Sequence, residues 1–116
     1  MSITIIAGGR NIDNIKYVEI ACKKAPWVIT EVVSGMARGV DTLGEEWANN
    51  HSIPIKQFPA NWDKYGRRAG PIRNEQMGDY AEALVAVWDG KSRGTKHMIN
   101  YATKKGLKVF VYKTNQ

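Results

Sequence analysis

Cysteine and long apolar runs are the scarcest features of this sequence. Its 116 residues include a single cysteine, Cys22, which excludes an internal disulfide, and the apolar helical stretch around it indicates a buried structural thiol. No apolar run approaches the roughly 20 residues that a membrane helix needs, and the N-terminus lacks a signal-peptide pattern. We therefore expect a cytoplasmic protein without a membrane partner.

Acidic residues are also few. Asp and Glu number 11 against 17 Lys and Arg, which gives a net charge of +6 and favours anionic partners without choosing among them. No group of Cys, His and carboxylate residues has the spacing of metal ligands, and no Ser, His and Asp arrangement stands out. We therefore expect neither a metal nor a cofactor.

What the sequence does contain is a regular alternation of short, β-branched apolar runs with helical patterns. The expected strands are residues 3–7, 27–33, 53–58, 84–88 and 107–112. Helices are expected after Asp13 and Asp41 as caps, from near Pro71, and over 95–105 before Gly106. This pattern predicts an α/β fold: residues 1–116 as one Rossmann-like domain, with a doubly wound parallel sheet of about five strands in the order 3-2-1-4-5 and helices on both faces.

Glycines and arginines gather directly after the expected strands. In an open parallel sheet the ligand crevice lies beyond the carboxyl ends of the strands, and glycine-rich turns and helix N-termini there suit phosphates. Arginine beside glycine favours phosphate or carboxylate binding, because the guanidinium group matches these anions. The candidate ligand-binding residues are Gly8, Gly9, Arg10, Ser34, Gly35, Arg38, Gly39, Asp41, Arg67, Arg68, Arg73, Asn74, Gly90, Ser92, Arg93, Gly94 and Thr95.

Several of these residues have alternative interpretations. Asp41 fits a helix cap better than a catalytic acid, and His97 fits a structural histidine better than a functional one. Residues 60–70 show no periodicity, which predicts the longest loop, and the segment 61–74 is expected to act as a mobile or partner-supported flap over the ligand. Within it, Trp62 and Tyr65 could stack on bases, stack on one adenine, or pack the loop.

Residues 34–41, Ser-Gly-Met-Ala-Arg-Gly-Val-Asp, resemble the S-G-x-A-R-G-x-D signature of the SLOG superfamily. That superfamily includes the DNA-processing Smf proteins, the LOG phosphoribohydrolases that release cytokinins, and small stand-alone YspA/YpsA-like proteins. The likeness continues through 58–74 and 88–95, and its W-x-x-Y-G-R-x-A-G-x-x-R-N pattern is similar to the stand-alone branch. The resemblance implies a Rossmann-like nucleotide-binding fold and a homo-oligomer, a dimer or higher.

The resemblance leaves enzymatic activity open. The LOG enzymes have an R-x-x-x-M segment and then G-x-G-T-x-x-E, whose arginine and glutamate are catalytic. Arg73 and Met77 match the first segment, but Met98 stands where the glutamate would be, which argues against LOG-type chemistry. We expect a binding module for a nucleotide-derived ligand, ADP-ribose-like or a signalling nucleotide. The alternatives are an N-glycosidase or phosphohydrolase acting on a nucleotide, and a binder of single-stranded nucleic acid.

Overall fold

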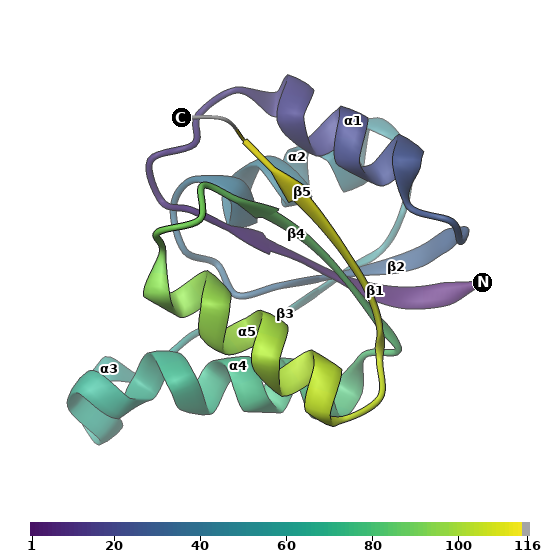
Figure 1. Cartoon of the computed structure of the whole chain (residues 1–116). Helices are drawn as coiled ribbons and strands as arrows, with labels where there is room; N and C mark the ends of the chain where they lie inside the picture. The colour runs from purple at the N-terminus through teal and green to yellow at the C-terminus, as the bar shows by residue number, and fades with distance from the viewer. Residues whose placement is uncertain (115–116) are drawn as a thin grey trace.

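The computed structural model describes residues 1–114 as a five-stranded sheet covered on both faces by helices (Figure 1). The strand order is β3-β2-β1-β4-β5, and all four neighbouring pairs are parallel. The predicted fold class and strand order are therefore confirmed. The strands are β1 (Ser2–Gly8), β2 (Ile29–Ser34), β3 (Ile55–Gln57), β4 (Ala83–Trp88) and β5 (Lys108–Lys113).

The helices form two layers on opposite faces of the sheet (Figure 1). One layer consists of α1 (Ile15–Lys24) and α2 (Val40–Asn50). The other consists of α4 (Ala69–Tyr80) and α5 (Arg93–Lys104), and a short helix α3 (Trp62–Tyr65) and a 3-10 turn η1 (Gly66–Arg68) lead into it. Right-handed crossovers between parallel strands produce this doubly wound arrangement.

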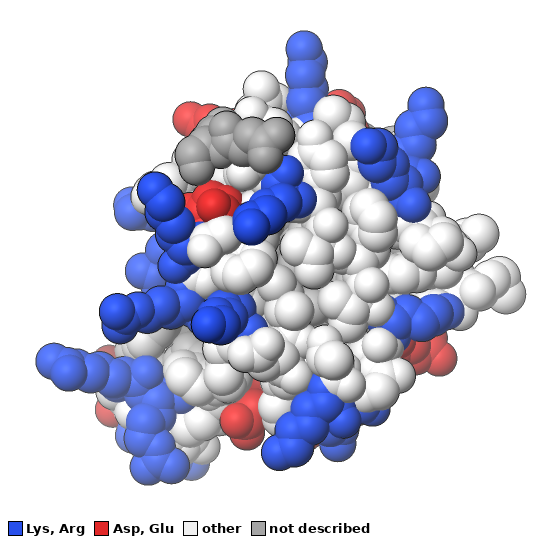
Figure 2. Space-filling model, in the orientation of Figure 1, with Lys and Arg blue, Asp and Glu red and all other residues white. Residues whose placement is uncertain are grey.

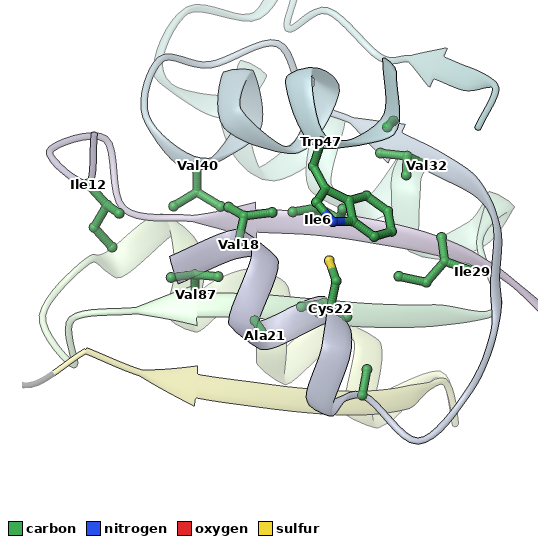
Figure 3. Close-up of a cluster of buried hydrophobic side chains, with 13 residues drawn as sticks. Ile6, Ile12, Val18, Ala21, Cys22, Ile29, Val32, Val40, Trp47 and Val87 are labelled. Carbon is green, nitrogen blue, oxygen red and sulfur yellow. The ribbon is translucent and has the colours of Figure 1, made fainter. Parts of the chain in front are cut away.

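Successive side chains of a strand point to opposite faces of the sheet, so the strands contribute to a hydrophobic core on each face. Ile6 of β1 packs with Val18 and Trp47 beneath α1 and α2, whereas its neighbour Ile5 packs with Met77 and Met98 beneath α4 and α5. In Figure 3 the sulfur of Cys22 points toward Trp47 inside the first cluster. Burial raises the pKa of the Cys22 thiol to about 12, so it stays protonated at neutral pH, as expected of a structural thiol.

Two expected helix caps are wrong. Asn14, not Asp13, caps α1, because its side-chain Oδ1 accepts a hydrogen bond of 3.0 Å from the Lys16 amide. Gly39 occupies the cap position of α2, and Asp41 lies inside the first turn. The carboxylate of Asp41 instead accepts from the Ala37 amide at 3.3 Å, which orders the preceding loop rather than the helix.

The long loop expected over 60–70 is also wrong, because this segment is helical. Asn61 caps α3 by accepting from the Lys64 amide at 3.1 Å, η1 follows, and α4 begins at Ala69, two residues before the expected start at Pro71. Each turn is too short to show a hydrophobic period, and neither contains a buried residue. The segment of the flap hypothesis, 61–74, therefore consists of α3, η1 and the first half of α4 rather than a loop, and its mobility stays a prediction.

Candidate functional site

A crevice of about 520 Å³ lies beyond the carboxyl ends of β1 and β4, at the switch in strand order. We call it the first crevice. It brings together residues that lie far apart in the sequence, from the turn after β1, the loop before α5, and the first half of α4. The sequence-predicted residues that line it are Gly8, Gly9, Arg10, Asp41, Arg73, Asn74, Ser92, Arg93, Gly94 and Thr95.

A second crevice, of about 660 Å³, shares Arg10, Ala37 and Arg73 with the first. Its remaining lining residues are Gly35, Met36, Arg38, Pro59, Ala60 and Trp62. The two crevices are therefore adjacent, with the two shared arginines between them. In Figure 2, Lys and Arg side chains gather on the left side of the molecule, where β4 ends and α3 lies in Figure 1.

Five sequence-predicted residues lie outside both crevices. Arg67 and Arg68 are exposed on η1, and Gly90 has a φ of +84° beside Lys113. Ser34 is buried, and its hydroxyl accepts from the Met36 amide. Gly39, the fifth, joins two backbone segments. Seven lining residues of the first crevice are absent from the predicted set: Ala7, Asn11, Ala37, Met77, Asp89, Lys91 and Met98. The position of Lys91 between Asp89 and Ser92 could have identified it.

The glycines after β1 and before α2 allow two backbone segments to meet. A Cβ atom at Gly8 would lie 2.1 Å from the carbonyl oxygen of Val87, and one at Gly39 would lie 2.3 Å from that of Gly9. The Val40 amide donates to the Gly9 carbonyl at 3.2 Å, so the start of α2 is tied to the turn after β1. Gly39 has a φ of +82°, which favours glycine. Gly8 and Gly39 are therefore needed for the close packing of the turn after β1, which lines the first crevice, against β4 and the start of α2.

The N-terminus of α5 is ordered by side-chain acceptors of the loop that precedes it. The Asp89 carboxylate accepts from the amides of Lys91 at 2.7 Å and Ser92 at 2.9 Å, and these bonds lower its pKa. Ser92 caps the helix by accepting from the Thr95 amide at 3.3 Å. The first amides of a helix have no partner within the helix, and the helix dipole favours negative charge there. This end of α5 lines the first crevice and is suited to a phosphate.

Arg73 is held by hydrogen bonds at two of its nitrogens. Its Nη1 donates to the Gly35 carbonyl at 2.5 Å, and its Nε donates to Asn74 Oδ1 at 3.1 Å. The Nδ2 of Asn74 donates to the Gly94 carbonyl at 3.2 Å and lies 3.2 Å from His97 Nδ1, which must then accept. Burial lowers the pKa of Arg73, although arginine remains charged at neutral pH. His97 therefore supports Asn74, and Asn74 orients Arg73.

Asp41 is a buried carboxyl group in the first crevice, with 6% of its surface exposed. Burial raises its pKa to about 6, against the nearby positive charge of Arg73, which lowers it. A Cβ atom at Gly35 would lie 2.7 Å from Arg73 Nη1 and 2.8 Å from Asp41 Oδ2. Because Gly35 has no Cβ atom, the side chains of Arg73 and Asp41 can both lie close to its backbone.

Asp41 is expected to make folding less favourable as the pH rises from about 4 to about 6. Its pKa is about 6 in the folded chain against an ordinary value of 3.8, so the folded state binds more protons in this window. A pKa shift of this size lowers the free energy of unfolding at neutral pH by about 2–3 kcal/mol. Asp41→Asn should remove this contribution. Urea denaturation at pH 4 and pH 7 measures the difference between wild type and variant, and an equal difference at both values would contradict the assignment.

Within residues 1–114, no group of three or more His, Cys, Asp or Glu side chains is arranged to hold a metal ion. Over the same residues, none of the helices is both long and apolar enough to cross a membrane.

Comparison with known proteins identifies the family of this chain. The sequence model of the YspA, cpYpsA-related SLOG family (YAcAr) matches residues 3–65, which include the turn after β1 and residues 34–41. Gene 61 protein of Mycobacterium phage D29 is 33% identical over 84 residues, covering 67% of each chain. The uncharacterized SPbeta prophage-derived protein YoqJ of Bacillus subtilis (strain 168) is 56% identical over 32 residues, covering 28% of this chain and 19% of that protein.

The fold has a solved counterpart. DNA processing protein A (DprA) from Streptococcus pneumoniae matches with a TM-score of 0.72 at 17% sequence identity. The match covers 94% of this chain and 49% of the DprA chain, so this chain spans about half of that protein's length. Since the family model covers more than half of the sequence, the chain belongs to the YspA, cpYpsA-related SLOG family.

Proposed function

We propose that this chain binds a nucleotide-derived ligand, ADP-ribose-like or a signalling nucleotide, with its phosphates in the first crevice. The observation that carries the proposal is the convergence of the α5 N-terminus with Arg10, Arg73, Lys91 and Arg93 on one cavity. Helix amides and guanidinium groups together provide donors and positive charge where a phosphate needs them. The volume of about 520 Å³ is in the range of small-molecule sites.

Hydrolysis of the bound nucleotide is a second candidate function, favoured by Asp41. Its carboxyl group lines the first crevice and has a pKa of about 6, so about a tenth of it is protonated at pH 7, and this form could donate a proton to a leaving group. Hydrolysis would add water across an N-glycosidic or phosphate bond. The buried Met98 also lines the crevice at the position of the LOG glutamate, so Asp41 would have to replace that carboxylate.

Single-stranded nucleic acid is the competing ligand. The exposed Arg67 and Arg68 extend the positive charge beyond both crevices, as a longer polyanion would require. A small nucleotide would leave these two arginines without a role in binding.

Isothermal titration calorimetry with ADP-ribose tests the proposal. Arg93→Glu and Lys104→Glu make the same charge change at the first and last residues of α5. Arg93→Glu should weaken ADP-ribose binding by at least about tenfold, the effect of losing one charged hydrogen bond, and Lys104→Glu should leave it within about twofold.

Equal losses in the two variants, or absence of binding by wild type, would contradict the proposal. Mass spectrometry of the recovered ADP-ribose separates the two functions, because intact ligand indicates binding alone and smaller products indicate hydrolysis. Two results would favour the nucleic-acid alternative. A short oligothymidylate would displace ADP-ribose, and Arg67→Ala would weaken oligothymidylate binding more than Arg93→Glu does.

A further inference from the structure

The second crevice differs in character from the first, because it exposes two large apolar side chains. Trp62 is 51% exposed and Met36 is 47% exposed, and both line this cavity. Arg38 is the charged residue in its lining that the first crevice does not share. An aromatic surface, an adaptable thioether and a guanidinium group match a flat ring with an apolar face and polar edges.

Met36 is held in a backbone conformation that suits glycine better. Its φ is 63°, in the left-handed region that disfavours a residue with a Cβ. Hydrogen bonds on both sides fix this conformation: the Met36 amide donates to Ser34 Oγ at 3.1 Å, and the Ala37 amide donates to Asp41 Oδ2 at 3.3 Å. This strained backbone holds a side chain that is exposed at the crevice and not packed in the core. Strained backbone that holds an exposed side chain is typical of ligand-binding positions.

Trp62 is positioned on a helical turn rather than on a free loop. It is the first residue of α3, whose cap is formed by Asn61. A Cβ atom at Gly70 would lie 3.5 Å from Trp62 Cη2, so the far end of the indole rests against the start of α4. The rest of the ring remains half exposed at the second crevice and is available for stacking.

We propose that the second crevice is a nucleobase subsite, in which the base stacks on Trp62 and contacts Met36. This inference rests on the proposed function, because the phosphates occupy the first crevice and the ligand passes between the crevices at Arg10 and Arg73, which line both. Arg38 donates to acceptor atoms on the edge of the base. A nucleotide with both base and phosphates fits this pair of cavities, whereas a sugar phosphate fills only one of them.

The test compares ADP-ribose with ribose 5-phosphate, which lacks a base. In calorimetric titrations, Trp62→Ala should weaken ADP-ribose binding by about 5- to 150-fold, the range expected for losing one base–aromatic stack. Its ribose 5-phosphate affinity should match that of wild type. Trp62→Phe retains an aromatic ring and should stay within about threefold of wild type for ADP-ribose.

Tyr80→Ala is the matched control, because it removes another exposed aromatic ring at the opposite end of α4, outside both crevices. It should leave both affinities unchanged. Wild-type ADP-ribose affinity in Trp62→Ala would overturn the nucleobase subsite while leaving the proposed function intact, and so would an equal loss for ribose 5-phosphate. If wild type binds neither compound, the proposed function fails and the subsite fails with it.

Discussion

Gly39→Ala is expected to lower the free energy of unfolding by about 3–5 kcal/mol, the largest loss of stability among the substitutions considered for this chain. Gly39 has a φ of +82°, and an alanine held there costs about 1–3 kcal/mol. The new Cβ would also lie 2.3 Å from the Gly9 carbonyl oxygen and 2.6 Å from that of Arg10, and overpacking of this kind adds a similar amount. Urea denaturation followed by circular dichroism gives the difference.

Gly94→Ala is the control for this prediction. Gly94 lies in the first turn of α5, and a Cβ atom there would meet no atom within 4 Å. Alanine is a better helix former than glycine, so the free energy of unfolding should stay constant or rise by up to about 0.5 kcal/mol. If the two variants were equally stable, the turn after β1 and the start of α2 would not be packed as described.

Arg73→Ala is expected to weaken ADP-ribose binding by about 1.5–3 kcal/mol, or roughly 10- to 150-fold. Arg73 lines both crevices and is held in place by Gly35 and Asn74, so its removal affects phosphates and base together. Calorimetry measures the loss. Arg67→Ala removes an exposed arginine outside both crevices and should bind ADP-ribose as wild type does.

The same substitution tests the electrostatic link between Arg73 and Asp41. The charge of Arg73 lowers the pKa of Asp41, so Arg73→Ala should raise that pKa further above 6 and destabilise the chain most at neutral and alkaline pH. Adding Asp41→Asn to Arg73→Ala removes the uncompensated charge. Asp41→Asn should therefore raise the free energy of unfolding more in the Arg73→Ala background than in wild type at pH 8, and equal gains in the two backgrounds would show that the two residues are uncoupled.

The sheet could be predicted from the sequence because its strands are distinct in composition. Ala83–Trp88 is continuously apolar and buried at all positions but the last, as expected of a central parallel strand. The location of the glycine-rich turns at one edge of the sheet could also be predicted, because it follows from the parallel topology. Element ends were less predictable: Asn14 and Asp13 are both good caps, and the hydrogen bond to Lys16 that distinguishes them is a property of the folded chain.

The candidate site was harder to predict for two physical reasons. Glycines serve both as ligand-binding turns and as points of close packing, and only the positions of Val87 and Gly9 show that Gly8 and Gly39 are needed for packing. Residues 61–70 form short turns without a buried stripe, so no period reveals them. The second crevice depends on this segment, which is why the Trp62 and Met36 pairing could not be predicted from the sequence.

The most direct test of nucleotide binding at this edge of the sheet is a titration of ¹⁵N-labelled protein with ADP-ribose, followed by amide chemical shifts. The largest changes are expected at Gly9 and Arg10, over residues 92–95, and over residues 36–38, together with a shift of the Trp62 indole N–H. Amides of α1 and of the C-terminal half of α5 should change little. Saturation with no change at residues 9–10 and 92–95, or changes confined to η1, would contradict nucleotide binding at this edge of the sheet.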